Sequence, residues 1–473
     1  MEILKINDIK FSRDSVVDQF GRIFFYQDKI YRLINNDIIL NCKEFLNSSL
    51  FSKLVNLGYI VKTNIVTTFK IEGYELILEH QKILDTKPNE WSFLMYKDAV
   101  LLIYNINKIS NEYGYELKDA HPHNILFDGN RPIFIDIGSF QKITNKDYWT
   151  ANHEFINTMI LPLRLWSKGE YYFLRLLLEN DFYNKRLLPL QSIESVKYIK
   201  NILEEEEEFV IYKKNIINLI TTSKIISFFF RLINLIIRKI INKKEYNFFN
   251  IKRRYKLIKD ISHINKIYKK EMDSSWENYH SEYFTPDGIN STPRFDRIML
   301  LVKELCSDSQ TAIDLAGNQG IFTFLLEKME FFDLIILSDY DENAIDKAYS
   351  YIKKNKSKVK TLLLNWMLPI NLTSIAKRVK SDIVFALGIT HHLILSQTFS
   401  ISVIFERLNM YSKKYVVVEF MPLGLWNGIT APEIPSWYTQ EWFKLNFEYF
   451  FELLHTEQLE PNRIIFLGKK RLD

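Results

Sequence analysis

The C-terminal part of the sequence alternates short apolar runs with amphipathic stretches, and this pattern is the strongest constraint on its fold. Five runs are expected strands, and each ends at or near polar residues: TAIDLAG, LIILSD, KTLLLN, DIVFALG and KYVVVEF. Strands that alternate with helices form a parallel sheet covered on both faces. Ligands of such sheets bind beyond the carboxyl ends of the strands. We therefore predict a Rossmann-like α/β domain over residues 273–473, with its site at that edge.

The first apolar run leads into the strongest binding motif of the chain, TAIDLAGNQGIFTFLLEK. The expected strand ends at Asp314, and Gly317 and Gly320 precede the expected helix. Glycines let the backbone approach a ligand closely, and Asp314 can accept hydrogen bonds from an amino group. The spacing is GxxG, whereas a dinucleotide-binding turn has GxGxxG, so the motif does not favour a bound pyrophosphate.

The next two runs place further polar groups at the same edge. Asp339 ends the second expected strand, 22 residues after Gly317, and an acid at this place binds a ribose diol. Asn365 ends the third run. Its amide either reads the edge of an adenine or caps the loop that follows, and both interpretations stand at this point.

The fourth and fifth runs supply candidates for catalysis. His391 and His392 follow the fourth run, and Glu419 lies near the end of the fifth. A histidine can take a proton from a hydroxyl during group transfer. We predict one of the pair as general base, with His391 preferred because His392 directly precedes the apolar LIL. Glu419 is predicted to orient the imidazolium, and the other histidine to cap the strand or pack inside.

The N-terminal part contains a second kind of motif in LKDAHPHNILFDGNRPIFIDIGSF, residues 117–140. Asp119 precedes Asn124 by five positions, and Asp136 ends a short apolar run before a glycine. A kinase catalytic loop and its metal-binding Asp have this layout. Asp119 would orient an accepting hydroxyl, while Asn124 and Asp136 would bind Mg²⁺ on ATP if the site is active. The alternative is that all three form turns and caps.

Upstream elements are expected in kinase-like order. Residues 22–34 are predicted to form a hairpin that turns at residues 27–29, and residues 41–58 a helix that ends at Gly58. A strand is predicted at residues 74–80 and a long helix at residues 90–114. No Gly-rich phosphate loop precedes the hairpin, and Arg32 with Glu44 replaces the usual Lys–Glu pair. The pattern thus allows an active kinase, or an inactive or nucleotide-sensing module, over residues 1–200.

Between these parts, residues 201–272 form a predicted helical, basic linker. Its segment 215–244 is rich in Ile, Leu and Phe and is interrupted by cations. Lys224, Arg231 and Arg238 are seven residues apart and share one helix face. No uncharged run approaches the about 18 residues that a span requires. The apolar face either packs on the N-terminal domain or lies in the plane of an anionic membrane surface. No nucleic-acid reading module accompanies the cations, so no nucleic-acid partner is predicted.

Composition excludes several other classes of protein. The 473 residues exceed one ordinary core, and the two cysteines exclude a disulfide scaffold and a four-cysteine metal site. The first residues carry charges and no apolar signal segment, so we expect a cytoplasmic protein, with the membrane interpretation of residues 215–244 placing it at the inner face.

Several stretches together resemble a known family: EWSFLMYKDAVLL, LKDAHPHNILF, PIFIDIGSF, WENYHSEYF, AIDLAGNQGIFT, ALGITHHL, VVVEFMP and WYTQEWF. The C-terminal half resembles class I S-adenosylmethionine (SAM)-dependent methyltransferases. The whole chain resembles two-part methyltransferases related to nodulation host-specificity proteins. The resemblance implies SAM as cofactor, with its methionine end over the glycine turn and its ribose on Asp339. It would be bound by Asp314, Gly317, Asn318, Gly320, Asp339 and Asn365.

Two positions depart from the family pattern: Ala316 replaces a more usual Gly or Cys, and Asn365 a more usual Asp. The resemblance further implies O-methylation of a sugar hydroxyl in bacterial surface polysaccharide or glycolipid biosynthesis, with a saccharide or glycolipid acceptor. Two alternatives are a glycan kinase with a regulatory SAM-binding domain, and a non-catalytic scaffold of glycan assembly.

Overall fold

The computed structural model describes most of residues 2–169 and 283–471, with isolated positions between them. Within those ranges it leaves out residues 13–14, 16–17, 146–148, 286–287, 370, 427 and 431. The chain divides into two compact units. The first comprises Met1–Leu102, His123–Asp136 and Met272–Asp473, and the second Ile103–Pro122 and Ile137–Glu271. Most of the predicted linker, including the amphipathic segment 215–244, lies outside the described residues.

The N-terminal part of the first unit contains an antiparallel five-stranded sheet. Its order is β2-β3-β4-β7-β5, formed by Lys10–Phe11, Gly21–Tyr26, Lys29–Ile34, Ile77–His80 and Thr63–Ile65. Gln27 and Asp28 connect β3 and β4 with positive φ angles of 47° and 61°. Two such residues give the turn whose twist matches a two-residue hairpin. The predicted hairpin is therefore confirmed, as is a strand ending at His80.

Two helices, rather than the predicted single helix, occupy residues 41–58. They are α1 (Ile39–Leu46) and α2 (Ser49–Asn56). The hydroxyl of Ser48 accepts a hydrogen bond from the backbone N–H of Phe51 at 3.1 Å. An N-cap of this kind satisfies a donor that a helix start leaves unpaired, so Ser48 begins a new helix where the apolar period alone predicted continuation. Gly58 follows α2 at a φ of 69°, as predicted for the end of the segment.

The long helix predicted before Gly114 is α3 (Phe93–Glu112), and Gly114 has a φ of 78°. In the second unit, β8 (Tyr115–Leu117) pairs antiparallel with β11 (Phe140–Lys142). Beyond them, α4 (Asn152–Phe155), a π-helical turn (Ile156–Ile160) and α5 (Leu161–Lys168) form one continuous helical stretch. The indole of Trp149 donates to the carbonyl of Leu117 at 2.6 Å and joins the sheet to this stretch.

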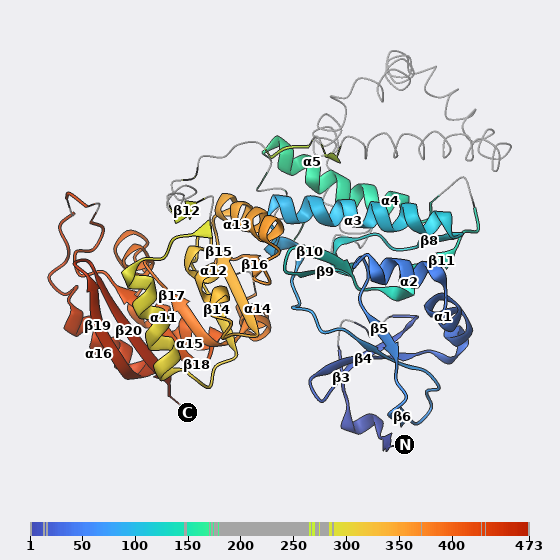
Figure 1. Cartoon of the computed structure of the whole chain (residues 1–473), viewed down its shortest axis with the longest axis horizontal. Helices are drawn as coiled ribbons and strands as arrows, with labels where there is room; N and C mark the ends of the chain where they lie inside the picture. Colours follow the sequence, from blue (N-terminus) through green and yellow to red (C-terminus); the bar gives the residue numbers. More distant parts are fainter. Residues whose placement is uncertain are drawn as a thin grey trace, which may run out of the picture. The chain divides into compact units, whose positions relative to one another are not determined.

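The C-terminal part of the first unit is a doubly wound α/β fold around a seven-stranded sheet (Figure 1). The sheet has the order β16-β15-β14-β17-β18-β20-β19, with β20 and β19 antiparallel to the five parallel strands. The parallel strands are β14 (Thr311–Asp314), β15 (Leu334–Asp339), β16 (Lys360–Leu363), β17 (Ser381–Ala386) and β18 (Ser412–Phe420). All five predicted strands and the α/β class are confirmed. The hairpin β19 (Phe451–Glu460) and β20 (Arg463–Lys470) was not predicted.

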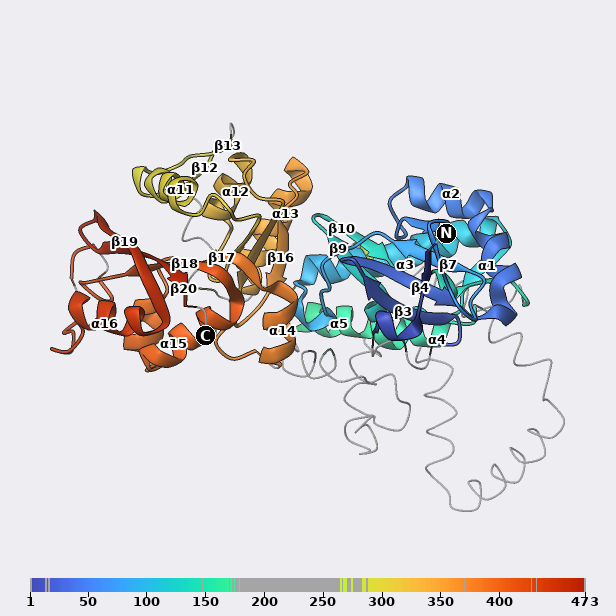
Figure 2. The ribbon, with the colours of Figure 1, turned by 90° about the horizontal axis from the view of Figure 1, so that it is seen from below.

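Helices cover both faces of this sheet (Figure 2). One face packs against α11 (Pro293–Leu305), α12 (Ile321–Lys328) and α13 (Glu342–Asn355), and the other against α14 (Leu372–Val379), α15 (Ile401–Tyr411) and α16 (Gln440–Phe450). Adjacent residues of β14 illustrate the division, because Ala312 faces the first set and Ile313 the second. Burial on both faces explains why these strands are continuous apolar runs.

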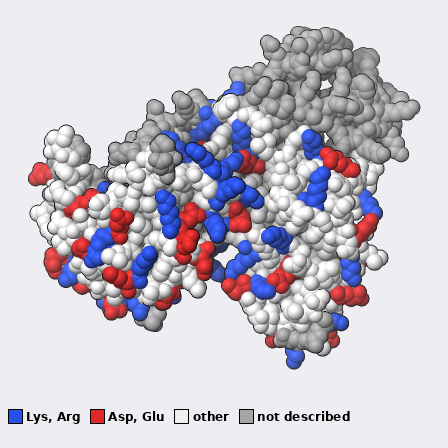
Figure 3. All heavy atoms as spheres, viewed as in Figure 1, with Lys and Arg blue, Asp and Glu red and all other residues white. Residues whose placement is uncertain are grey.

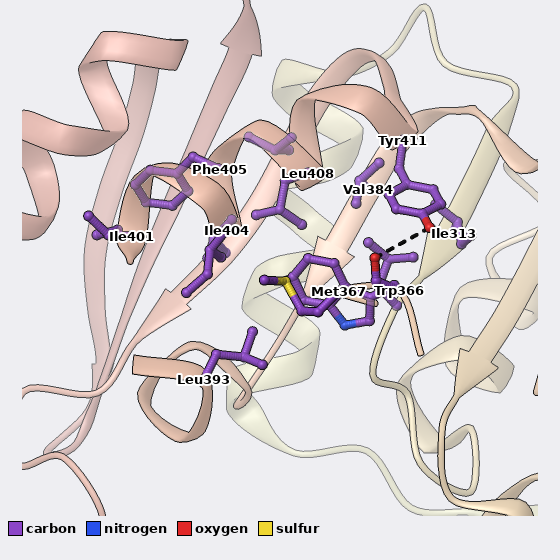
Figure 4. Close-up of a cluster of buried hydrophobic side chains, with 14 of the residues drawn as sticks. Ile313, Trp366, Met367, Val384, Leu393, Ile401, Ile404, Phe405, Leu408 and Tyr411 are labelled. Carbon is purple, nitrogen blue, oxygen red and sulfur yellow. Dashed lines mark hydrogen bonds between the residues drawn. The ribbon is translucent and has the colours of Figure 1, made fainter. Parts of the chain in front are cut away.

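The second of these cores supports the segment after β17 (Figure 4). Leu393, directly after the histidine pair, packs in one buried cluster with Ile404, Phe405 and Leu408 of α15. Tyr411 closes the cluster by donating its hydroxyl hydrogen to the carbonyl of Trp366 at 3.4 Å. Packing of this kind fixes the position of the histidines relative to the strand ends.

Lys and Arg are interspersed with Asp and Glu over the described part of the face drawn in Figure 3. The run of basic residues between 224 and 270 lies almost entirely outside the described residues. Within the described part of the chain, no helix combines the length and the apolar character needed to cross a membrane.

Candidate functional site

A cavity of about 770 Å³ lies at the carboxyl ends of β14, β15, β17 and β18. β14 and β17 are neighbours in the sheet, and the chain proceeds from them to strands on opposite sides. This is the topological switch point at which open α/β sheets bind ligands. Six of the residues predicted from sequence line the cavity: Asp314, Gly317, Asn318, Asp339, His391 and His392.

Asp314 is the buried acid at the end of β14. Its Oδ2 accepts a hydrogen bond from the Thr323 hydroxyl at 2.9 Å, whereas its Oδ1 is buried without a partner. Burial raises the pKa of Asp314 to about 7, and the nearby Asp339 carboxylate raises it further, while the Thr323 bond opposes the shift. A buried acceptor without a donor is costly. It is a place where a ligand's N–H group would be favourable.

Gly317 forms the adjoining wall of the cavity and leaves no room for a side chain. A Cβ built there would lie 2.3 Å from Leu337 Cδ1 and 2.7 Å from Asp314 Oδ2. Gly320 has a different role, because it begins α12 at a φ of 87° and is not among the lining residues. The sequence prediction for Gly320 is therefore corrected: it shapes the turn rather than facing the cavity.

Asp339 holds the glycine turn in place. Its Oδ2 accepts from the backbone N–H of Asn318 at 2.8 Å, and its Oδ1 from that of Asp341 at 2.9 Å. Asn318 itself has a positive φ of 51° and lines the cavity. Burial raises the pKa of Asp339 to about 6, while backbone hydrogen bonds from Asp341, Asn318 and Tyr340 lower it. A carboxylate has about four acceptor positions, so one is left for a diol.

Asn365 is exposed and does not line the cavity, which corrects its predicted place among the cofactor residues. β16 ends two residues earlier, at Leu363. The side-chain Oδ1 of Asn365 accepts from the backbone N–H of Leu368 at 3.1 Å. This local bond is the cap that short polar side chains make in turns.

His391 and His392 both line the cavity, with ring centroids 4.0 Å apart. His391 is buried, and its Nδ1 has no partner. Burial lowers the pKa of His391 to about 3, and His392 and the Arg463 charge lower it further. His392 is half-buried, and burial lowers its pKa as well. Both rings are therefore neutral at physiological pH, and the more exposed His392 faces the smaller cost of taking up a proton.

Glu419 is fully buried, and its partners differ from the predicted one. Arg294 Nη1 donates to both carboxylate oxygens at 3.0 and 3.1 Å, and Arg463 Nη1 donates to Oε2 at 2.9 Å. The backbone carbonyl of Glu419 accepts from the Thr390 hydroxyl at 2.6 Å. The carboxylate thus balances two arginines, and the orientation of an imidazolium by Glu419 stays a prediction.

Sequence reasoning missed most of the other lining residues, among them Arg294, Tyr340, Trp426, Glu460 and Arg463. Tyr340 could have been found, because it directly follows Asp339. The other four come from α11, the segment after β18 and the β19–β20 hairpin, for which no motif was recognised. Their position in the cavity depends on pairings distant in sequence.

The kinase-like residues are divided between the two units. In the first unit, Arg32 Nη1 contacts Asp136 Oδ1 at 3.2 Å and Asp18 Oδ2 at 3.5 Å. Asn124 accepts from the Ile135 backbone N–H at 2.9 Å through its carbonyl. These contacts give Arg32 carboxylate partners at Asp18 and at Asp136, the predicted metal-binding residue.

In the second unit, the backbone around Asp119 is fixed by two side chains. The Asp119 N–H donates to the Ser139 hydroxyl at 3.0 Å, and the Ala120 N–H donates to Glu154 at 2.6 Å. Within the described residues, no group of three or more His, Cys, Asp or Glu side chains is arranged to hold a metal ion. The metal-ligand assignments of Asn124 and Asp136 stay predictions.

The residues present at the cavity fit SAM. The unpartnered Oδ1 of Asp314 suits the amino group of its methionine part, and the backbone of Gly317 lines the cavity beside it. Asp339, at the end of the neighbouring strand, suits the ribose hydroxyls.

Comparison with known proteins gives three results. No family model matches the sequence. Among curated proteins, the nodulation protein NoeA of Rhizobium meliloti (strain 1021) is 22% identical over 427 residues, covering 86% of this chain and 83% of NoeA. A SAM dependent methyltransferase from Aquifex aeolicus has a TM-score of 0.32 and 15% identity, covering 42% of this chain and 100% of its own.

WbdD in complex with the kinase inhibitor LY294002 has a TM-score of 0.29 and 16% identity, covering 38% of this chain and 41% of WbdD. A further structure describes WbdD as a bifunctional kinase-methyltransferase. At such TM-scores and identities these proteins are similar to the chain without defining its family. The function is therefore inferred from the cavity and its residues.

Proposed function

We propose that this chain is a SAM-dependent methyltransferase that transfers the methyl group to a hydroxyl of a saccharide. The observation that carries the proposal is the pair of buried acids at adjacent strand ends, Asp314 and Asp339, on one cavity with Gly317 between them. An oxygen of Asp314 is buried without a donor, and Asp339 fixes the turn.

The charges around the cavity support a cofactor that carries positive groups. Three acids line it, Asp314, Asp339 and Glu460, against two arginines that already pair with the buried Glu419. SAM supplies a methyl group on a positively charged sulfonium and also carries an ammonium group. A cavity with an excess of carboxylates favours both cations, and burial strengthens that attraction.

A hydroxyl acceptor requires a base, because an alcohol keeps its proton until the methyl group is being transferred. His392 is the better candidate in the pair, since it lines the cavity, is only half-buried and can take up the proton at the smaller cost. His391, whose pKa is lowered to about 3, is too weak a base to hold a proton near neutral pH. The sequence preference for His391 is thereby reversed.

The saccharide class comes from the family resemblance of the sequence stretches given above. We place the protein in bacterial surface polysaccharide or glycolipid synthesis on the same ground, and in the cytoplasm, with contact of segment 215–244 to the inner membrane face as a further hypothesis. A second hypothesis is that the N-terminal site binds ATP and Mg²⁺. The hydrogen bond between Arg32 and Asp136 bears on this hypothesis, because Asp136 is the predicted metal ligand. A Mg²⁺ ion on Asp136 would compete with Arg32 for the carboxylate.

Calorimetric titration of the full chain with SAM tests the proposal. We expect binding by the parent protein and at least about tenfold weaker binding by Gly317→Ala, equivalent to about 1.4 kcal/mol. The added Cβ would displace Leu337 and the Asp314 carboxylate. Asn365→Ala is the matched control, because Asn365 caps a turn outside the cavity.

Circular dichroism and thermal melting establish that both variants are folded before they are titrated. Absence of SAM binding by the parent protein would contradict the proposal. Equal affinities for a folded Gly317→Ala and the parent would show that the cofactor is bound elsewhere.

A further inference from the structure

The cavity has a second wall that the cofactor residues leave unused. This acceptor wall comprises Trp426, Arg294, Glu460 and Arg463. Trp426 follows β18, Arg294 lies in α11, and Glu460 and Arg463 lie on either side of the turn between β19 and β20. Asp314, Gly317 and Asp339 line another part of the same cavity, whose volume is about 770 Å³.

Four charged groups form a closed ring on this wall. Glu419 pairs with Arg294 and with Arg463, as described above. Glu460 in turn contacts Arg463 Nε at 3.1 Å and Arg294 Nε at 3.8 Å. Two arginines and two glutamates give the ring no net charge. It therefore presents hydrogen-bonding groups to the cavity without an excess of positive charge.

The segment that carries Trp426 is fastened to the same hairpin. Asn462 is buried, and its Oδ1 accepts from the backbone N–H of Leu423 at 2.6 Å. Its Nδ2 donates to the carbonyl of Gly424 at 3.5 Å. Trp426 and the charged ring thus belong to one built surface rather than to separate loops.

We propose that this wall is the acceptor subsite and that it takes a neutral, polyhydroxylated ring, with a saccharide face stacked on Trp426 and its hydroxyls bonded to Glu460 and Arg463. Trp426 is 38% exposed and combines a large apolar face with a place on the cavity. The inference rests on the proposed methyl transfer to a sugar. It goes further by naming the residues that select the acceptor and by excluding an anionic one.

Neutrality follows from the charge count. An anionic acceptor would have to compete with Glu419 and Glu460 for arginines that are already paired. It would also approach Asp314 and Asp339 across the same cavity. A hydroxyl can instead donate to Glu460, whose side chain is 44% exposed, without disturbing the ring.

Fluorine NMR of the full chain labelled with 5-fluorotryptophan tests this subsite. The chain has eight tryptophans, and the Trp426 signal is assigned by its loss in Trp426→Phe. Trp437 is the matched control, because it is 49% exposed and does not line the cavity. The probes are D-glucose, D-galactose, N-acetylglucosamine and inorganic phosphate. Each is added up to about 100 mM, which fills about nine-tenths of a site whose Kd is about 10 mM.

We expect at least one neutral sugar to shift the Trp426 signal and not that of Trp437, while phosphate shifts neither. Glu460→Gln should weaken the sugar response about threefold to tenfold, the loss of one hydrogen bond. It should also create a response to phosphate, because the ring then carries a net positive charge. The same samples of the parent protein are titrated with SAM, so that cofactor binding is measured separately from the sugar response.

Three outcomes would overturn the subsite: no sugar response at Trp426, equal responses at Trp426 and Trp437, or a response of the parent protein to phosphate. Failure of SAM to bind would instead overturn the proposed function. The two failures are therefore distinguished in one set of samples.

Discussion

Replacing Asp314 by Asn tests the link between burial, stability and cofactor binding. Folding raises the pKa of Asp314 from its ordinary value of 3.8 to about 7. A group whose pKa is raised by folding contributes stability below its unfolded pKa and loses it as the pH rises through its folded pKa. The carboxyl of Asp314 should therefore cost the parent protein stability between about pH 4 and pH 8.

The magnitude follows from the shift. About three pKa units at 1.36 kcal/mol each give about 4 kcal/mol between the two pH limits. The Asn side chain of Asp314→Asn does not titrate. It does place an amide N–H₂ at the position where the buried Oδ1 lacks a partner, and this should destabilise the variant by about 1–3 kcal/mol at every pH. The variant should thus be less stable than the parent at pH 4 and more stable at pH 8, by about 1–3 kcal/mol each way.

Urea unfolding at several pH values, followed by hydrogen–deuterium exchange of peptides covering residues 311–328, measures this domain within the full chain. Asp333→Asn, an exposed carboxylate before β15, is the control and should keep the parental pH dependence. SAM binding by Asp314→Asn should weaken by about 10- to 150-fold, because a hydrogen bond to a charged group is lost. Parallel pH–stability curves for the variant and the parent would refute this reasoning.

Two further predictions concern catalysis and the charged ring. His392→Ala should lower the methyl-transfer rate by about 10²–10⁴-fold with little change in SAM affinity, measured by single-turnover assay and calorimetry; a parental rate would place the base elsewhere. Glu419→Gln should destabilise the folded domain by about 3–5 kcal/mol, since it leaves two largely buried arginines without their shared carboxylate. A thermal melt checks this, and an unchanged Tm would contradict it.

Local patterns in the sequence predicted the parallel part of the sheet and much of the cofactor wall. Runs of apolar residues marked all five parallel strands because both faces of the sheet are covered. Asp314 and Asp339 could be placed at one edge, since the carboxyl ends of parallel strands meet there. The same reasoning failed for Asn365, because a short polar side chain at a strand end serves equally as ligand or cap, and here it caps.

The N-terminal part shows the same limit. The turn at Gln27 and Asp28 was read from local residues, whereas the break at Ser48 depended on a capping bond that apolar periodicity does not register. Arg32 was predicted to act with Glu44, twelve residues away, whereas the structure shows it bonded to Asp136, 104 residues away.

The sequence by itself determined which runs are buried strands, where these strands end and which polar groups lie at their ends. Only the tertiary structure decided how Glu419 is used, because its partners Arg294 and Arg463 lie 125 and 44 residues away and meet it through α11 and the β19–β20 hairpin. Hydrophobic period and turn chemistry act between near neighbours in the chain. Ion pairs and cavity walls depend on which distant segments the sheet brings within hydrogen-bonding distance.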